Sequence, residues 1–150
     1  MKLVVQRCNR AAVRVRGETV AAIGHGALVL LAVADGDTPR EAEWLARKLA
    51  RLRIYDDADG RLNATIDAVD GAFLVVSQFT LYGDCTQGNR PSYIASAPPG
   101  PARALYEHFV AELQTLGHEV HTGRFRETMQ VELENDGPVT LILERRPKDA

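Results

Sequence analysis

The first third of the chain shows the apolar pattern of short β-strands separated by tight turns. Residues 12–16 alternate apolar and polar side chains, as a half-buried strand does. Gly17-Glu18 and Gly24-His25-Gly26 supply turn residues between the apolar segments. The predicted strands cover residues 3–7, 12–16, 19–23 and 28–33. Their short connections predict an antiparallel meander.

Two segments have the spacing of amphipathic helices. Thr38 can cap the first helix, Pro39 suits its first turn, and Glu41 stands where a capping box places a carboxylate. This helix ends near Leu52, and its apolar face consists of Ala42, Leu45, Ala46 and Leu49. The second helix covers residues 101–116, and its predicted inward side chains are Ala104, Leu105, Phe109, Val110 and Leu113.

The remaining segments add strands and one long loop. Residues 72–76 are a fully apolar strand, and residues 83–100 contain too many glycines and prolines for a regular element. Long loops in small domains are commonly functional, so we expect an ordered, functional loop there. Later strands are predicted over 119–122, 129–134 and 139–143. The pattern predicts a single α/β domain with helices on one side of its sheets.

Composition restricts the class of protein. The chain has 150 residues, of which 45% are hydrophobic and 25% charged, as in an average globular domain. No apolar run approaches the roughly 20 residues that cross a bilayer, and the first residues lack a signal peptide. Cys8 and Cys85 form neither a disulfide framework nor a metal-binding spacing. We therefore expect a cytoplasmic protein with no membrane partner.

The net charge of −2 hides an uneven distribution of basic residues. Residues 1–16 hold no acid and five basic side chains, Lys2, Arg7, Arg10, Arg14 and Arg16. The far end adds Arg145, Arg146 and Lys148. If both ends share a face, they form a basic patch able to hold phosphates. The alternative is a pair of ordinary solvated strand faces.

Patterns of catalytic and metal-binding residues are weak. Ser77, Thr80 and Cys85 are candidate nucleophiles, but no histidine stands in a recognisable triad context. A zinc site from His118, His121 and Cys85 lacks a strong spacing pattern. The acidic segment 56–60 resembles a calcium loop but lacks the glutamate at the twelfth position, so a solvated turn is favoured. We expect no metal and no cofactor.

Two polar segments carry more information than these single residues. Ser77-Gln78-Phe79-Thr80 follows a buried strand, where backbone amides can bind an anion or a carbonyl oxygen. In Asn135-Asp136-Gly137-Pro138-Val139-Thr140, glycine before proline permits unusual dihedral angles and a cis bond. Taken singly, the first is better explained as an ordinary strand terminus and the second as an ordinary hairpin turn.

Together, in this order, the two segments resemble the signature motifs of the D-aminoacyl-tRNA deacylases. The resemblance covers nearly the whole chain. It includes Val4-Val5-Gln6-Arg7, Leu52-Arg53-Ile54-Tyr55, Arg90-Pro91-Ser92-Tyr93, Ala97-Pro98-Pro99, Thr122-Gly123-Arg124-Phe125 and Met129-Gln130-Val131. The clearest departure is Arg126-Glu127, where a small Gly-Ala pair is expected.

The resemblance implies a three-layer α/β/β fold and a homodimer. It places catalysis at the strand end formed by Ser77, Gln78, Phe79 and Thr80. It implies that the partner subunit's Gly137 and Pro138, joined by a cis bond, complete each site, and that Arg7 steadies this dipeptide. Phe125 and Met129 are the further residues assigned to substrate binding.

The implied substrate is the 3′ adenosine of a tRNA carrying a D-amino acid, or glycine mischarged on tRNA(Ala). An aminoacyl ester is already activated, so positioning and carbonyl polarisation can hydrolyse it without a strong enzymatic base. A rigid Gly-Pro wall near the α-carbon would exclude L side chains by a clash. Two other interpretations stay open. One is a non-enzymatic RNA-binding module, and the other is a small esterase acting on metabolites, either with a catalytic triad or with Thr80 as nucleophile.

Overall fold

The fold is organised around one long antiparallel strand pair. The computed structural model describes residues 1–148. Its six-stranded sheet contains β1 (Lys2–Val15), β2 (Glu18–Ile23), β3 (Gly26–Ala32), β6 (Ala72–Ser77), β7 (Val120–Thr122) and β8 (Gln130–Glu144). The helices are α1 (Pro39–Ala50) and α2 (Pro99–Thr115). Short elements are β4 (Tyr55–Asp56), β5 (Leu62–Ala64) and the 3₁₀ turns η1 (Ile66–Val69) and η2 (Phe79–Tyr82).

β1 and β8 are each a single strand where the sequence pattern predicted two. They pair from Lys2 opposite Glu144 to Arg14 opposite Gln130. The turn-like residues inside each segment therefore lie within one strand pair, whose register shifts between Gln6 and Cys8 and again between Cys8 and Arg10. The hairpin interpretation of Gly137-Pro138 is wrong, because β8 does not reverse direction there.

The predicted meander is also wrong in its pairing. β2 and β3 do not pair with each other within residues 1–148; both pair with β1, β2 along its residues 11–15 and β3 along residues 2–8. β6 then joins β3 in parallel, and β7 joins β6 in parallel. A mixed sheet results, and its parallel part has buried strands, as parallel sheets covered on both faces do.

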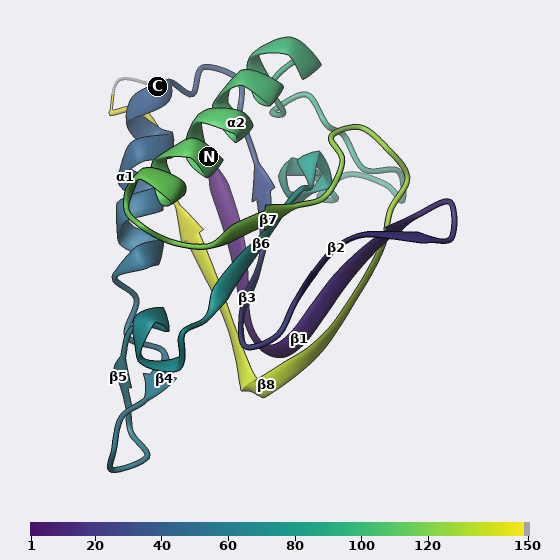
Figure 1. The fold of residues 1–150 in the computed structure, drawn as a ribbon. Helices are drawn as coiled ribbons and strands as arrows, with labels where there is room; N and C mark the ends of the chain where they lie inside the picture. Colours follow the sequence, from purple (N-terminus) through teal and green to yellow (C-terminus); the bar gives the residue numbers. More distant parts are fainter. Residues whose placement is uncertain (149–150) are drawn as a thin grey trace.

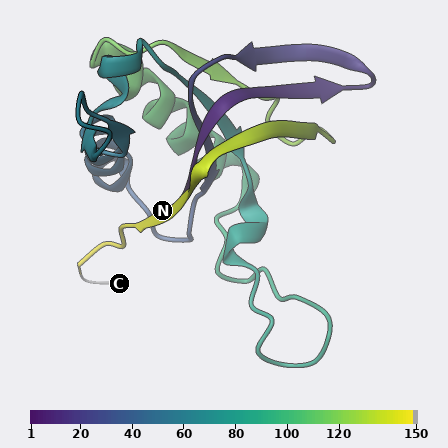
Figure 2. The same ribbon diagram turned by 90° about the horizontal axis from the view of Figure 1, so that it is seen from below.

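Two hydrophobic clusters lie on opposite faces of β3 and β6. Figure 1 shows α1 and α2 together on one side of the sheet, and Figure 2 shows β2 and the outer half of β8 extending away from them. The helix-side cluster includes Val29, Leu31, Phe73, Val75, Leu45 and Phe109. The other includes Leu28, Leu74, Val76, Val13, Ala21 and Ile23. The α/β class with helices on one side is confirmed, but the second β layer is the outer half of the same bent sheet.

The helices agree with their sequence signals in most details. The carboxylate of Glu41 accepts hydrogen bonds from the backbone N and the Oγ1 of Thr38, at 2.8 and 2.6 Å, so the predicted capping box is present. α2 begins at Pro99, before the predicted start. Ala104 is exposed, contrary to prediction, and the inward position belongs to Tyr106, whose hydroxyl donates to the carbonyl of Val75 at 3.0 Å.

The predicted basic patch is largely neutralised. Because β1 lies beside β8, its arginines meet the acidic side chains of that strand. Arg10 and Arg14 both pair with Glu132, at 2.7 and 2.8 Å. Lys2 faces Glu144 at 3.9 Å. Arg145 of the C-terminal segment stacks over the Trp44 ring, 4.8 Å from its centre.

The acidic segment after α1 forms a small hairpin that the sequence pattern missed. β4 and β5 flank a turn in which Asp57 Oδ1 accepts hydrogen bonds from the amides of Asp59 and Arg61, at 2.9 and 3.0 Å. The favoured interpretation as a turn is confirmed. Within residues 1–148 no helix is long and apolar enough to span a membrane.

Candidate active site

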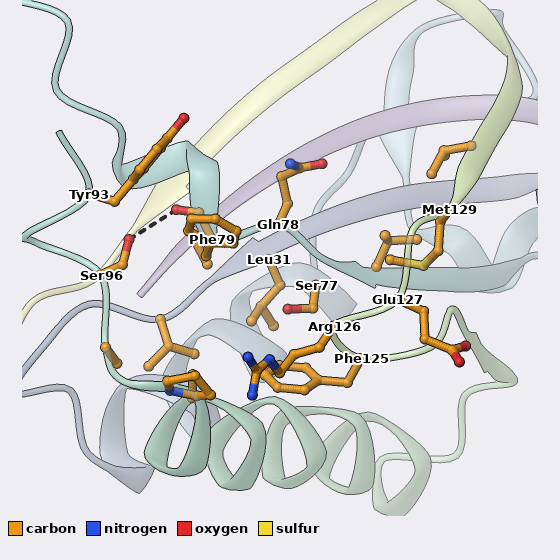
Figure 3. A pocket seen from close by; sticks show the side chains of 17 residues that line it. Leu31, Ser77, Gln78, Phe79, Tyr93, Ser96, Phe125, Arg126, Glu127 and Met129 are labelled. Carbon is orange, nitrogen blue, oxygen red and sulfur yellow. Dashed lines mark hydrogen bonds between the residues drawn. The ribbon is translucent and has the colours of Figure 1, made fainter. Parts of the chain in front are cut away.

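A cavity of about 550 Å³ opens where β3 and β6 end. Its apolar floor comes from Leu31 of β3, from Val33 just after that strand, and from Val76 of β6. α2 closes one side with Pro99 and Ala102. Figure 3 shows how the labelled side chains surround this space. A concave, mostly apolar cavity with a few polar groups at its edge is the usual form of a small-ligand site.

The end of β6 places a run of backbone polar groups at the mouth. The parallel pairing with β3 reaches Ser77 opposite Leu31, and the amide of Gln78 still donates to the carbonyl of Leu31 at 2.7 Å. The chain then enters the 3₁₀ turn η2, which begins at Phe79. The first amides of a helical turn have no acceptor inside it, so those of Phe79 and Thr80 are available to a ligand. This arrangement suits an oxyanion or a carbonyl oxygen.

The long loop after η2 is tied to this strand end. Ser96 Oγ donates to the carbonyl of Phe79 at 3.1 Å. The Phe79 ring meets the Tyr93 ring edge to face, with centres 5.1 Å apart. Antiparallel bridges join Ala34 to Ser96 and Asp84 to Ser92. The prediction of an ordered loop at residues 83–100 is confirmed, and the loop supplies one wall of the cavity.

Apolar side chains remain exposed around the mouth. Phe79 is 55% exposed, Tyr93 40% and Ile94 91%. Neighbouring apolar side chains exposed to this degree commonly mark a contact surface. Figure 2 shows the loop after η2 projecting away from the sheet.

The opposite wall comes from the segment between β7 and β8. Phe125 and Met129 line the cavity, together with Arg126 and Glu127. Gly123 is held close to the sulfur of Met129, which lies 2.7 Å from where a Cβ would stand. Arg126 has a φ of 66°, a left-handed conformation that glycine adopts more readily.

Gly137 and Pro138 lie elsewhere, in a bulge of β8. The pairing with β1 jumps from Gln6 opposite Thr140 to Cys8 opposite Asn135, so the residues between them bulge out beside Arg7. The Asn135 side chain closes this bulge, donating to the carbonyls of Arg7 and Val139 at 2.9 and 3.1 Å. The Gly137-Pro138 bond is cis and Gly137 has a φ of 140°, so the predicted cis conformation is confirmed.

Arg7 is buried directly beneath the bulge. Its Nε donates to the carbonyl of Asp136 at 3.0 Å, and its Nη1 donates to the carbonyl of Ile54 at 2.8 Å. The carboxylate of Asp136 lies 3.2 Å from the same Nε. Two hydrogen bonds to backbone carbonyls and one ion pair hold the planar guanidinium of Arg7. Arg7 therefore fixes the position of Asp136, which precedes Gly137.

The structure brings together only part of the predicted site. The predicted residues that line the cavity are Ser77, Gln78, Phe79, Phe125 and Met129. Thr80 stands just outside and accepts a hydrogen bond from Gln78 Nε2 at 2.5 Å. Arg7, Gly137 and Pro138 do not line the cavity of their own chain.

The competing zinc site is not formed. His121 contacts Glu119 at 2.7 Å, while His118 lies 3.6 Å from Asp67. Residues 1–148 contain no group of three potential ligands, so the zinc interpretation from His118, His121 and Cys85 is wrong. No histidine from this part of the chain lines the cavity, which leaves Ser77 without the base that a triad needs.

Several lining residues were not predicted individually. Tyr93, Ser96 and Ala97 belong to the long loop, and the concentration of glycine and proline there was the available signal. Leu31 and Val33 were recognisable only as strand residues, because strand periodicity does not show which strand end opens into a cavity. Arg126 and Glu127, which depart from the small pair expected at these positions, both lie in the cavity wall.

Comparison with known proteins agrees with this geometry. A family model described as D-Tyr-tRNA(Tyr) deacylase matches residues 4–144. The chain belongs to this family. A D-aminoacyl-tRNA deacylase of Desulfatibacillum aliphaticivorans is 52% identical over 146 residues, covering 97% of this chain and 100% of the relative. One of Anaeromyxobacter dehalogenans is 54% identical over 146 residues, covering 97% and 98%.

Solved structures show the same fold for this deacylase-family chain. A structure described as c-Myc DNA Unwinding Element Binding Protein superposes with a TM-score of 0.92 at 38% identity, covering 98% of this chain and 100% of that one. A probable eukaryotic D-amino acid tRNA deacylase superposes with a TM-score of 0.81 at 16% identity, covering 95% and 97%. The first structure resembles this chain in both sequence and fold. The second, at 16% identity, resembles it in fold alone.

Proposed function

We propose that this protein hydrolyses the ester between a D-amino acid and the 3′ adenosine of tRNA. The observation that carries the proposal is the pairing of a cavity at the β6 end with free amides in the adjoining turn, in a chain of the deacylase family. We extend the proposal to glycine mischarged on tRNA(Ala). If L-amino acids are excluded by a steric clash of their side chain, glycine is not excluded, because it has no side chain. The reaction takes place in the cytoplasm, where tRNA is charged.

The amides of Phe79 and Thr80 polarise the ester carbonyl and stabilise the oxyanion that forms as water attacks. The adenosine occupies the apolar floor near Leu31, where Phe125 offers an aromatic face. The substrate's own 2′-hydroxyl organises the water, and this role agrees with a cavity that no histidine of residues 1–148 lines. Positioning then accounts for the rate, with no acyl-enzyme intermediate.

Chirality is read by the partner subunit's Gly137 and Pro138 in a two-fold homodimer with three-layer α/β/β subunits. Two observations support this assembly. The bulge is held by Arg7 but does not line the active-site cavity of its own chain. The cavity lining includes the exposed Phe79 and Tyr93, and the next residue in the chain is the exposed Ile94; a second copy would cover these side chains. An L side chain would then strike the bulge, while a D side chain points to solvent.

The decisive assay is deacylation of matched D-tyrosyl-, L-tyrosyl- and glycyl-tRNA by the purified protein. We expect the D ester to be cleaved at least ~100-fold faster than the L ester, which corresponds to roughly 2.7 kcal/mol. Equal rates on both enantiomers contradict chiral proofreading. Binding of tRNA without hydrolysis would instead favour the RNA-binding module.

Two further measurements test the details. Ser77→Ala and Thr80→Ala should reduce turnover without abolishing it, since their side chains form no covalent intermediate. An aminoacyl adduct trapped on Thr80 would establish the esterase alternative. Light scattering should give twice the chain mass of 16.5 kDa, and a fully active monomer would refute the shared site.

A further inference from the structure

A second cavity, also about 550 Å³, continues from the first along α2. The two cavities share Phe125 and Glu127 as a common wall. The first meets α2 at its beginning, through Pro99 and Ala102, and the second runs along the following turns. The segment between β7 and β8 therefore crosses a longer groove whose two halves meet at Phe125.

Three arginines surround this crossing. Arg103 and Arg124 line the second cavity, and Arg126 lines the first. Arg103 lies over the Phe125 ring, 5.8 Å from its centre. Figure 3 shows Arg126 on the same wall as Phe125, beside α2. Glu107 and Glu127 lie in the same linings, so three arginines and two glutamates leave a formal excess of one positive charge next to an aromatic ring.

Arg124 and Arg126 are less closely paired with acidic groups than the arginines of β1 are. Within residues 1–148, no acidic group lies within the 4.0 Å ion-pair distance of Arg126. Arg124 reaches Glu127 only at 3.8 Å. Arg103 pairs with Glu107 at 2.9 Å, but both side chains are more than half exposed, and exposed pairs of this kind contribute little. All three arginines can therefore exchange their present contacts for a phosphate at small cost.

The backbone conformation of Arg126 indicates that its side chain has a function in the site. Left-handed φ in a residue other than glycine costs about 1 kcal/mol or more and persists mainly where the site benefits from it. With this left-handed backbone, the Arg126 side chain lies along the cavity wall. A glycine at this position would adopt the same backbone without strain but would place no positive charge there.

We propose that the second cavity binds the nucleotide that precedes the terminal adenosine of the substrate. This inference rests on the proposed function. With adenosine in the first cavity, the connecting phosphate passes Phe125 and meets Arg126, while Arg103 and Arg124 flank the next sugar and base. Single-stranded RNA is held by arginine contacts to phosphates and by stacking on aromatic rings and guanidinium planes. Gln114 and Thr122 supply polar groups for the base edge.

The test compares three D-tyrosyl esters of increasing length, on adenosine, on the dinucleotide cytidylyl-adenosine and on full tRNA. For the native protein, kcat/KM should rise between adenosine and the dinucleotide. Arg103→Gln, which lines the second cavity alone, should lower kcat/KM about tenfold on the two longer esters and leave the adenosine ester within about twofold. Arg126 also lines the first cavity, so Arg126→Gln should lose about tenfold more kcat/KM on the two longer esters than on the adenosine ester. Each lost phosphate contact should also reduce the logarithmic salt slope by about 0.7.

Arg61→Gln is the matched control, because Arg61 is an exposed arginine on the β4–β5 hairpin and lines neither cavity. It should change none of the three rates. Arg126→Gly separates charge from folding, since it relieves the left-handed strain. Arg126→Gly should raise the free energy of unfolding. Its kcat/KM on the two longer esters should fall as much as that of Arg126→Gln.

The outcomes separate the two proposals. If the native protein cleaves none of the three esters, the proposed function itself fails. If it cleaves them and the arginine variants lose equally on adenosine and tRNA, or lose nothing on tRNA, the second cavity is not a nucleotide site. A change of oligomeric state in Arg103→Gln or Arg126→Gln would assign the groove to contact between subunits instead.

Discussion

Arg7 and Asp136 are joined twice, by a hydrogen bond from the arginine Nε to the backbone carbonyl at 3.0 Å and by an ion pair with the carboxylate at 3.2 Å. They are far apart in sequence, and their contact fixes the entry to the β8 bulge. The other side of the same guanidinium holds the carbonyl of Ile54 at 2.8 Å. One side chain thus connects β1, the segment before β4 and the bulge that we assign to chiral selection.

Arg7→Ala should lower both the stability of the fold and the discrimination between D- and L-aminoacyl esters. The Arg7 side chain is only 8% exposed, so truncation leaves two backbone carbonyls without a donor and should cost about 2–4 kcal/mol of the free energy of unfolding. The D/L rate ratio should fall, because the bulge is no longer held. Urea unfolding and deacylation of both enantiomers measure the two effects. Arg10→Ala, on the same strand and exposed, should cost under about 1 kcal/mol; an equal loss in both variants would remove the special role of Arg7.

Gly137→Ala should abolish substrate cleavage while the chain still folds. An added Cβ would stand 2.7 Å from the backbone N of Val139 and 2.8 Å from its Cγ2, so the bulge must shift. The φ of 140° adds a strain of about 1 kcal/mol or more for alanine. Gly36→Ala is the control, since Gly36 has a φ of 87° but open space around its Cβ position. Loss of deacylation in both variants, or in neither, would argue against the bulge as a wall of the site.

Tyr55→Phe should stabilise the protein. Tyr55 is buried, and its hydroxyl has no hydrogen-bond partner within residues 1–148. Removing an unpaired buried hydroxyl should raise the free energy of unfolding by about 1 kcal/mol. Tyr106→Phe provides the opposite case, because the Tyr106 hydroxyl donates to Val75, and it should lower stability by a similar amount. Chemical denaturation of the pair gives the sign of each change, and destabilisation by Tyr55→Phe would show that its hydroxyl is paired.

The two cysteines should differ in reactivity without either being the nucleophile. Cys8 is buried, and desolvation raises the pKa of its thiol to about 11, so little thiolate exists near pH 8. Cys85 is exposed on the loop and outside the cavity lining. Iodoacetamide should therefore modify Cys85 alone, as read by mass spectrometry, and deacylation should remain nearly unchanged. Complete inactivation by this single modification would contradict a mechanism without a cysteine nucleophile.

Ser96→Ala tests the tether between the loop and the strand end. Its hydroxyl donates to the carbonyl of Phe79 at 3.1 Å, in an exposed setting. We expect a drop of about threefold to tenfold in kcat with under about 1 kcal/mol lost in stability, because the amides of the turn become less well positioned. Ser92→Ala, in the same loop, is the control. A fully active Ser96→Ala protein would show that the turn holds its geometry without the loop.

Local sequence determined the elements whose signals lie within a few residues. The capping box of Thr38 and Glu41 specified the start of α1, and the apolar segment 72–76 specified β6 with its polar end at Ser77. The signature segments around Phe79 and Gly137 identified the family, because they combine residue types that few other chains carry in that order. These features depend on backbone preferences and side chains that are neighbours along the chain.

Only the tertiary structure decided how these parts meet. The pairing of β1 with β8 joins residues more than a hundred positions apart, and it turned two expected strands into one, opened the bulge at Gly137 and neutralised the arginines of β1. Strand register between distant segments depends on packing on both faces of the sheet, which no local pattern contains. For the same reason, Phe125, Arg103 and Arg126 became neighbours across one groove only when α2 and the β7–β8 segment packed together.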